Sequence, residues 1–276
     1  MADIRIAEAE SRVYRAPLDT PVQTSFGIMR DRPMVLLLLR ASDGVTGLGE
    51  VWYNFPAEGA DYKSRLFASV VAPSLMARAF ADPGEAAEYL DARVATLAIQ
   101  CGEPGPFSCL LAAVDQALCD IAAQREGVAL WRWLGAGKAG ACARLCQRTN
   151  PTAPEALAAA RLDEGYAAFK LKIGFSTDRD RRNLDGLQQL LRDDAALMVD
   201  ANQAWTLEQA REALCWLSDY GLRWLEEPMR ADLPARDWEA LARDGSVPLA
   251  AGGWRLARTC CGSRIFARPF WEMRCP

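Results

Sequence analysis

The stretch that decides the fold is Phe169-Lys170-Leu171-Lys172-Ile173-Gly174, a short apolar run that carries two lysines at alternate positions. Two runs of the same design follow, Met198-Val199-Asp200 and Trp224-Leu225-Glu226, and a fourth is Val247-Pro248-Leu249-Ala250. The runs centre near residues 169, 198, 224 and 249, so they are 29, 26 and 25 residues apart. Each spacing is about one strand plus one helix. Repeated units of this kind predict a parallel sheet, either doubly wound or closed into a barrel.

Helix signals fill the intervals between these runs. Thr152 with Glu155 and Thr206 with Gln209 have the spacing of capping boxes. A helical stripe follows the second box, at Leu207, Ala210, Leu214 and Leu217. Gly221 and Gly245 stand where helices should end. No Gly-x-Gly-x-x-Gly follows a strand, which counts against a dinucleotide-binding fold.

The part of the chain before residue 135 has a different pattern. Residues 4–14, 34–40 and 45–52 are rich in β-formers, and Asp43-Gly44 predicts a hairpin turn between the last two. A helical face follows at Leu110, Val114, Leu118 and Ile121, with Gly127 as the stop. We therefore expect an α+β domain with a helical bundle at residues 1–135 and a second domain of βα units at residues 136–252.

Composition restricts the function classes. The 276 residues are 51% hydrophobic and 25% charged, and the net charge of −4 gives no basic footprint for nucleic acid. The apolar runs are too short to span a bilayer, and the N-terminus lacks signal-peptide features, so we expect no membrane partner. Nine cysteines without Cys-x-x-Cys spacing suit a reducing cytoplasm. The absence of histidine excludes Ser–His and Cys–His nucleophile pairs.

The ends of the apolar runs carry the candidate chemistry. Alternate residues of a strand share a face, so Lys170 and Lys172 point together and their apolar neighbours point toward the helices. Asp200 and Glu226 end neighbouring strands, where active sites of barrels lie. Two carboxylates there suit a hard cation such as Mg²⁺, and a lysine beside another lysine suits a base. Taken singly, the lysines also fit an edge strand's surface, and each acid also fits a helix cap or a surface ion pair.

Four segments together carry a family resemblance. They are the Lys-x-Lys strand, Val199-Asp200-Ala201-Asn202-Gln203, Trp224-Leu225-Glu226-Glu227-Pro228 and the helix at residues 112–121. Residues 3–252 are similar to the mandelate racemase/muconate lactonizing enzyme family of the enolase superfamily. The resemblance implies an α/β, enolase-like fold, with an N-terminal α+β capping domain and a (β/α) barrel. It also implies abstraction of a proton α to a carboxylate, through an enediolate held by Mg²⁺, with Mn²⁺ as the alternative ion.

The resemblance assigns roles to residues of this chain. Lys172 corresponds to the base, and Lys170 to the neighbour whose charge favours the neutral form of that base. Asp200 and Glu226 correspond to metal ligands, and we expect Asn202 and Glu227 to orient them. Residues 20–32 and 52–57 correspond to loops that cover a small carboxylate substrate, and their candidate side chains are Phe26, Trp52 and Phe55. A symmetric homo-oligomer is the usual assembly of the family.

The resemblance ends near Gly252. The family's next strand usually ends in a third acidic ligand, and the residue at that position is Gly253. We expect about five of eight barrel strands. Residues 253–276 contain five arginines, one acid and three cysteines, and 14 of the 24 residues are Gly, Trp, Arg, Cys or Pro. We interpret this tail as an out-of-frame segment following truncation of the family sequence.

The interpretation is a racemase, cycloisomerase or acid-sugar dehydratase that is inactive in this form. One alternative is a non-catalytic pseudoenzyme or interaction module, and another is an α/β-barrel enzyme that uses no metal. Metal binding would separate the first interpretation from the last, and turnover would separate it from the pseudoenzyme.

Overall fold

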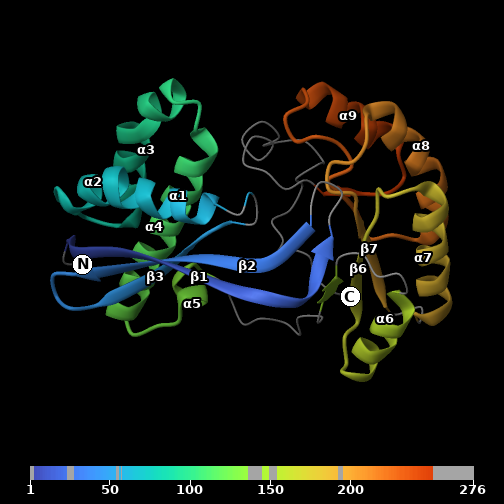
Figure 1. Ribbon diagram of the computed structural model, residues 1–276, viewed down its shortest axis with the longest axis horizontal. Coiled ribbons are helices and arrows are strands. Elements are labelled where there is room, and N and C mark those ends of the chain that lie inside the picture. The colour runs from blue at the N-terminus through green and yellow to red at the C-terminus, as the bar shows by residue number, and fades with distance from the viewer. Residues whose placement is uncertain are drawn as a thin grey trace. The chain divides into compact units, whose positions relative to one another are not determined.

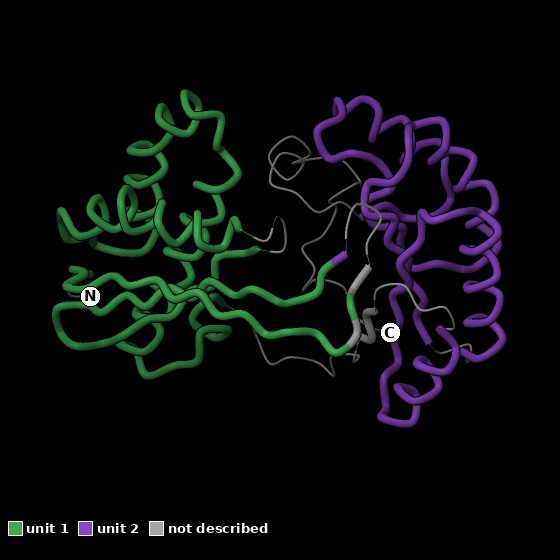
Figure 2. Tube along the Cα trace, in the orientation of Figure 1, with its two compact units in different colours: residues 1–21, 29–139 green, residues 22–28, 140–276 purple. Residues whose placement is uncertain are grey.

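The computed structural model describes residues 3–23, 28–53, 56, 58–135, 145–148, 154–191 and 195–250. The chain divides into two compact units (Figure 2). Unit 1 comprises residues 1–21 and 29–139, and unit 2 comprises residues 22–28 and 140–276. The tail at residues 253–276 and the position of Gly253 lie outside the described residues.

Unit 1 contains a four-stranded sheet of order β3-β2-β1-β4. Its strands are β1 (Ile4–Gln23), β2 (Ile28–Ala41), β3 (Thr46–Val51) and β4 (Ala79–Phe80). The predicted hairpin at Asp43-Gly44 is confirmed. Arg40 pairs with Thr46, and Gly44 has a φ of 91° in the left-handed region, where glycine carries no steric penalty.

The loop expected at residues 20–32 is shorter than predicted. β1 runs on to Gln23 and β2 begins at Ile28, so the sequence signals placed both strand ends too far from the turn. β1 and β2 are neighbours in the sheet. Backbone pairing between neighbours overrides the weak β-propensity of the segment at residues 15–23, which contains Pro17 and Pro21.

Helices pack against this sheet in unit 1 (Figure 1). They are α1 (Gly59–Leu66), the π-helical turn η1 (Phe67–Val71), α2 (Ala72–Met76), α3 (Pro83–Gln100), α4 (Pro104–Arg125) and α5 (Leu130–Trp133). The predicted face of α4 is confirmed, because Leu110, Val114, Leu118 and Ile121 are all buried in the core. α4 is long and apolar enough to cross a membrane by length and composition alone. Half of that stretch is buried in the protein, as expected of a core helix.

Two glycines of β3 allow α4 to lie directly on the strand. A Cβ atom on Gly49 would lie 1.9 Å from the carbonyl oxygen of Ala113, and one on Gly47 would lie 2.0 Å from that of Ala117. Backbone atoms of a helix cannot rotate away as a side chain can. The bare glycine backbone therefore sets the distance between α4 and the sheet.

Replacing Gly49 with Ala should lower the free energy of unfolding by about 1 to 3 kcal/mol or more, because the new methyl group forces α4 away from β3. Urea denaturation of the purified chain measures the change. Gly105→Ala is the matched control within α4, since nothing lies within 4 Å of its added Cβ. That control should be neutral or slightly stabilising. Equal stability of the two variants would contradict the proposed close packing.

Unit 2 contains a parallel sheet in which the strands follow chain order, β5-β6-β7-β8-β9. Its strands are β5 (Leu145–Arg148), β6 (Ala168–Lys172), β7 (Ala196–Asp200), β8 (Leu225–Glu226) and β9 (Leu249–Ala250). Its helices are α6 (Pro154–Asp163), α7 (Thr177–Leu190), α8 (Leu207–Leu217), η2 (Ser218–Tyr220) and α9 (Ala235–Asp244).

Helices α6 to α9 lie together along one face of this sheet (Figure 1). A doubly wound sheet reverses its strand order and carries helices on both faces. An unreversed order with helices on one face is instead the arrangement of a (β/α) barrel wall. The predicted fold class is therefore confirmed, with five barrel strands among the described residues.

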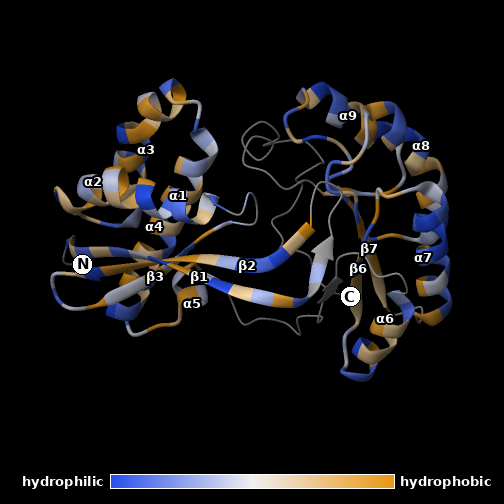
Figure 3. Ribbon diagram, in the orientation of Figure 1, coloured by the Kyte–Doolittle hydropathy of each residue, from blue (hydrophilic) through white to orange (hydrophobic). Residues whose placement is uncertain are grey.

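The two faces of β6 differ as the alternation predicts. Phe169, Leu171 and Ile173 are buried in the core that the sheet shares with the helices. The hydropathy colouring in Figure 3 shows apolar strands in this unit, while α7 is largely polar. Its buried residues include Leu184 and Leu187. The lysines of β6 lie on the other face.

The helix-end predictions are confirmed where they can be observed. Thr206 and Gln209 form both hydrogen bonds of a capping box at the start of α8. Gly221 ends the following turn with a left-handed φ of 58°. α9 ends before Gly245, but that residue is extended rather than left-handed. The capping box at Thr152 lies outside the described residues.

Candidate active site

The strands of unit 2 place three predicted site residues in one row across the sheet. Lys172 on β6 is in register with Asp200 on β7, and Asp200 is in register with Glu226 on β8. All three stand at the carboxyl ends of their strands. This arrangement follows from the sequence, because each apolar run ends on one of these polar residues. The neighbouring strands pair side by side with their carboxyl ends aligned.

Lysines and carboxylates in this row form a compact charge cluster. The Nζ of Lys170 lies 2.6 Å from Oε2 of Glu226 and 3.5 Å from Oδ2 of Asp200. The Nζ of Lys172 donates a hydrogen bond to Oδ2 of Asp200. Lys172 is 8% exposed and Asp200 is 2% exposed. The side chains of both lysines and of Asp200 are therefore largely removed from water, whereas that of Glu226 is 26% exposed.

The ion pairing of the two lysines differs from the sequence-based expectation in one respect. The lysines share a face as predicted, but each ammonium group contacts a carboxylate from a neighbouring strand. A buried charge without a partner is costly, so two lysines on this face need two nearby anions. Asp200 and Glu226 provide them. Lys170 lies between both carboxylates and is the cation that they share.

The donor set fits a hard divalent cation in part. Asp200 and Glu226 offer carboxylate oxygens from adjacent strands, and Mg²⁺ sites commonly use one or two carboxylates plus waters and substrate oxygens. Within the described part of the chain, no group of three His, Cys, Asp or Glu side chains could hold a metal ion. On β9, the residue in register with Glu226 is Ala250. The described residues thus fit a two-carboxylate site.

The loop after β7 supports Asp200 through its backbone. The N–H of Asn202 donates to Oδ1 of Asp200 over 2.9 Å. Asn202, Gln203 and Glu227 have φ values of 48°, 63° and 44°, which non-glycine residues rarely adopt. Such strained residues cluster at functional sites, where the surrounding structure holds them in place.

Gln203 links the loop after β7 to the loop after β8. Its N–H donates to the carbonyl oxygen of Glu227 over 2.6 Å, and its Nε2 lies 3.3 Å from Oε2 of Glu227. Its own side-chain oxygen accepts the N–H of Ala231. Burial raises the pKa of Glu227. Sequence reasoning named Glu227 but overlooked Gln203, although Gln203 stands next to Asn202 in the same motif.

Trp224 also contacts the cluster. Its Nε1 lies 3.3 Å from Oε2 of Glu226, the oxygen that Lys170 contacts. This indole N–H therefore contacts the carboxylate oxygen that the lysine also binds. The tryptophan precedes Glu226 by two residues, so it lies on the same face of the strand.

Asp180 is a second residue that sequence reasoning missed. It lies in the first turn of α7, is 2% exposed, and its Oδ2 accepts the N–H of Gly174 over 2.8 Å. Burial raises the pKa of Asp180 to about 6, although hydrogen bonds from the backbone of Gly174 and Phe175 oppose the shift. An acid in a first helical turn is usually exposed, so no sequence signal distinguished Asp180 from Asp178.

Replacing Asp180 with Asn should alter how stability depends on pH. The folded pKa lies above the unfolded value of about 3.9, so protonated Asp180 stabilises the fold fully below pH 4 and this contribution is lost as pH rises through about 6. Asparagine carries no charge at any pH. Relative to the parent, the variant should therefore gain unfolding free energy as pH rises from about 4 to about 6.

Urea denaturation across this pH range measures that difference. Asp178→Asn, on the same turn but exposed, is the control and should show no such gain. If the unfolding free energies of Asp180→Asn and the parent differed by the same amount at every pH, the result would contradict the titration of Asp180.

The candidate residues of the covering loops lie in unit 1 or outside the described residues. Phe26 and Phe55 are outside them. Trp52 follows β3 and is 64% exposed, which excludes a core role for its ring. The Nζ of buried Lys63 donates to its carbonyl oxygen over 2.9 Å and so fixes the backbone there. A substrate contact by Trp52 remains a prediction.

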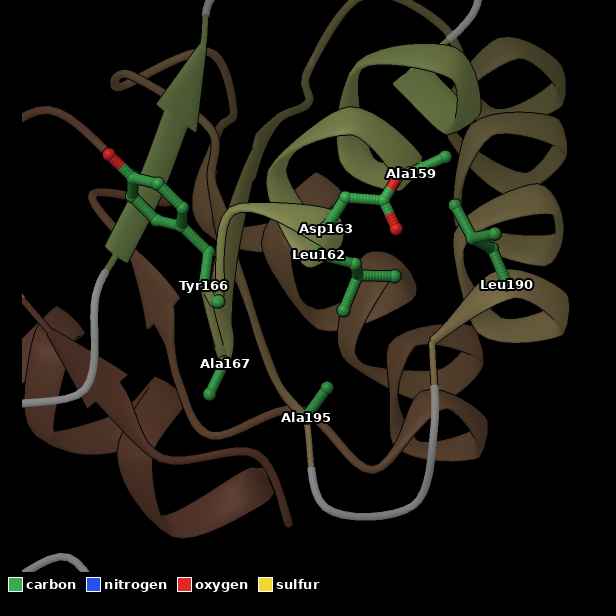
Figure 4. A pocket seen from close by; sticks show the side chains of 8 residues that line it. Ala159, Leu162, Asp163, Tyr166, Ala167, Leu190 and Ala195 are labelled. Atoms are coloured by element: carbon green, nitrogen blue, oxygen red, sulfur yellow. The ribbon is translucent and has the colours of Figure 1, made fainter.

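A cavity of about 380 Å³ lies in unit 2 (Figure 4). Its lining residues are Ala159, Leu162, Asp163, Gly165, Tyr166, Ala167, Leu190 and Ala195. Ala167 and Ala195 come just before β6 and β7, whereas Lys172 and Asp200 end those strands. The cavity is therefore at the opposite end of the sheet and is not part of the candidate active site.

Comparison with known proteins gives two family matches. Residues 7–135 match the model described as mandelate racemase / muconate lactonizing enzyme, N-terminal domain. Residues 153–253 match the model described as enolase C-terminal domain-like. The second match includes all the residues of the charge cluster.

Among curated relatives, the 3,6-anhydro-alpha-L-galactonate cycloisomerase of Streptomyces coelicolor is 30% identical over 234 residues, covering 82% of this chain and 63% of the relative. Other relatives are named as an epimerase, racemases and a further cycloisomerase. The chain spans 59% to 63% of the length of three of these curated relatives.

Solved structures agree with these matches. A mandelate racemase/muconate lactonizing enzyme from Bordetella bronchiseptica RB50 is 46% identical with a TM-score of 0.84, covering 94% of this chain and 69% of that one. A racemase from Streptomyces coelicolor A3(2) with bound magnesium is 25% identical with a TM-score of 0.79, covering 90% of this chain and 69% of that one.

Proposed function

Because the chain belongs to the mandelate racemase/muconate lactonizing enzyme family of the enolase superfamily, we propose that its charge cluster is a site for abstracting a proton α to a carboxylate. The observation that carries the proposal is the row of Lys172, Asp200 and Glu226 across three neighbouring strand ends. The row combines a candidate base with two candidate metal ligands. Homologues of the chain are racemases, epimerases and cycloisomerases, which suits this reaction type.

Lys172 is the proposed base. In the reaction, its neutral amine takes the proton from the substrate α carbon, and the electron pair of the broken C–H bond moves toward the carboxylate oxygens. Lys172 donates to Asp200 in the present arrangement. Before its nitrogen can accept the substrate proton, Lys172 must break this hydrogen bond and release one ammonium proton to water. Lys170, whose ammonium lies between both carboxylates, is the proposed neighbour of this base on the same face of β6.

Asp200 and Glu226 are the proposed ligands of Mg²⁺, and a related racemase structure contains bound magnesium. When bound there, Mg²⁺ would supply positive charge against the negative charge that develops on the substrate carboxylate. Asn202 holds Asp200 through its backbone N–H, and Gln203 holds the adjacent loop through Glu227. These contacts would keep the carboxylates in place as the substrate reacts.

The substrate class in this proposal is a small carboxylate. Racemisation, cycloisomerisation and dehydration all begin with the same proton abstraction, so the described residues are compatible with each of them. We further propose a cytoplasmic location for the protein and a homo-oligomeric assembly for the intact family member.

Lys172→Arg tests the proposal without removing the buried positive charge. Arginine can still pair with Asp200, but its guanidinium stays protonated and cannot serve as a base. The exchange of α hydrogen for solvent deuterium should therefore fall by about 10²-fold or more in the variant. Nuclear magnetic resonance detects this exchange in a panel of 2-hydroxycarboxylates, dipeptides and N-succinylamino acids with Mg²⁺ present.

Two results would decide against the proposal. Exchange in Lys172→Arg as fast as in the parent would exclude Lys172 as the base. No exchange by the parent chain with any carboxylate of the panel would overturn the proposal for this chain and would agree with the inactive form that the sequence predicts. Lys63→Arg, in unit 1, is a control for the arginine substitution, since Lys63 is a buried lysine outside unit 2.

A further inference from the structure

The turn between β6 and α7 connects Lys172 to Asp180. Ile173 and Gly174 follow Lys172 directly, and Gly174 has a φ of 89°. The N–H of Gly174 donates to Oδ2 of Asp180 over 2.8 Å. The N–H of Asp180 in turn donates to the carbonyl oxygen of Ser176 over 2.9 Å. The carboxylate thus ties the end of β6 to the first turn of α7.

The same turn rests on the loop that follows β7. The N–H of Ile173 donates to the carbonyl oxygen of Asp200 over 2.9 Å. A Cβ atom on Gly174 would lie 2.7 Å from Cβ of Ala204 and 3.1 Å from the carbonyl oxygen of Ala201. Gly174 is therefore in close contact with the loop at residues 201–204, which begins immediately after Asp200.

The loop at residues 201–204 also contacts the residues that follow β8. Asn202 donates to the Asp200 carboxylate, and Gln203 donates to the backbone of Glu227. The turn after β6 is therefore hydrogen-bonded to the end of β7 and packed on the loop at residues 201–204, and that loop is hydrogen-bonded to the turn after β8. Asp180 holds the first of these turns.

We propose that Asp180 is a positioning residue of the candidate active site, whose carboxylate holds Gly174 against the loop at residues 201–204 and so fixes Asp200 relative to Lys172. The assignment rests on the proposed function in that these two residues form its reactive site. Asp180 contacts the turn and acts on the site only through it.

The energetics support a positioning role over simple packing. Oδ1 of Asp180 is buried and has no hydrogen-bond partner among the described residues. Burying an ionised carboxylate with one unpartnered oxygen costs free energy that an apolar side chain of similar size would not incur. Leucine at this position, however, would leave the N–H groups of Gly174 and Phe175 without their acceptor. The carboxylate is needed for the turn.

Amide hydrogen exchange of the full chain tests this inference without any metal or substrate. Asp180→Leu removes the acceptor, and Asp180→Asn keeps a side-chain oxygen that can accept the N–H of Gly174. The amides of Ile173 and Ala204 should exchange about tenfold faster in Asp180→Leu than in the parent, whereas amides inside α8 should change little. Asp180→Asn should restore the parent rates at both positions. Asp178→Leu, exposed on the same helical turn, should change neither.

Two outcomes would overturn the inference. One is unchanged exchange at Ala204 in Asp180→Leu, and the other is a uniform increase throughout α7, α8 and α9. Should Asp180→Leu fail to fold, Asp180→Glu provides the same comparison, because it keeps the charge but displaces the carboxylate by one methylene group. It is then expected to increase exchange at the same two amides, and parent-like rates would overturn the inference.

Calorimetric titration with Mg²⁺ separates this inference from the proposed function. If the parent binds Mg²⁺, Asp180→Leu should bind it about fivefold or more weakly, because Asp200 is less well fixed, and Asp180→Asn should restore the parent affinity. Unchanged affinity in Asp180→Leu would overturn the link from Asp180 to Asp200. If the parent does not bind Mg²⁺, the proposed metal ligands are wrong, and the exchange experiment alone decides the role of Asp180.

Discussion

Lys172→Met is expected to lower the free energy of unfolding by about 3 to 5 kcal/mol, because it removes one partner of a buried ion pair. Asp200 is only 2% exposed and accepts the hydrogen bond of Lys172 through Oδ2. Methionine fills a similar volume but carries no charge. Lys170 lies 3.5 Å from the same oxygen and already contacts Glu226 at 2.6 Å, so it can replace the lost partner only in part.

Urea denaturation of the parent, of Lys172→Met and of two further variants measures this change in the free energy of unfolding. Asp200→Asn in the Lys172→Met background should recover much of the lost stability, because no unpaired buried charge then remains. Arg211→Met is the matched control, since the pair of Arg211 with Asp244 is exposed and should contribute about 1 kcal/mol or less. A loss in Lys172→Met no larger than in Arg211→Met would show that the cluster is effectively hydrated.

The sequence predicted the barrel sheet because its signals are local. Each strand is a short apolar run, and the helix between two runs has its own caps, as Thr206 and Gly221 show. In a barrel wall, parallel strands pair in chain order, so the barrel that the family resemblance implies brings Lys172, Asp200 and Glu226 into one row. The row is thus a direct consequence of where the apolar runs end.

Side-chain contacts between strands could not be predicted in the same way. The contact of Lys170 with Glu226 joins residues 56 positions apart. It depends on how far each side chain reaches across β7. Asp180 has the same local signal as Asp178, and only tertiary packing buries one and exposes the other. The extension of β1 to Gln23 depends on pairing with its neighbour β2, which residue propensities do not contain.

Lys170→Met is expected to bind Mg²⁺ about tenfold or more tightly than the parent chain, because it removes the cation that lies between the two carboxylates. In the proposed site, an incoming divalent ion would meet the ammonium group of Lys170. The Nζ of Lys170 lies 2.6 Å from Oε2 of Glu226 and 3.5 Å from Oδ2 of Asp200. Two like charges cannot share that position. The lysine side chain must move before the ion binds, and methionine imposes no such requirement.

Calorimetric titration of four chains with Mg²⁺ measures the expected change. Lys170→Arg keeps the positive charge and should bind no more tightly than the parent. Glu226→Gln in the Lys170→Met background should lose the gain, because a carboxylate oxygen is the ligand that Mg²⁺ prefers. Equal affinities of Lys170→Met and the parent would mean that Lys170 does not compete with the ion. Binding that survives Glu226→Gln would mean that the ion occupies a different position from the one between Asp200 and Glu226.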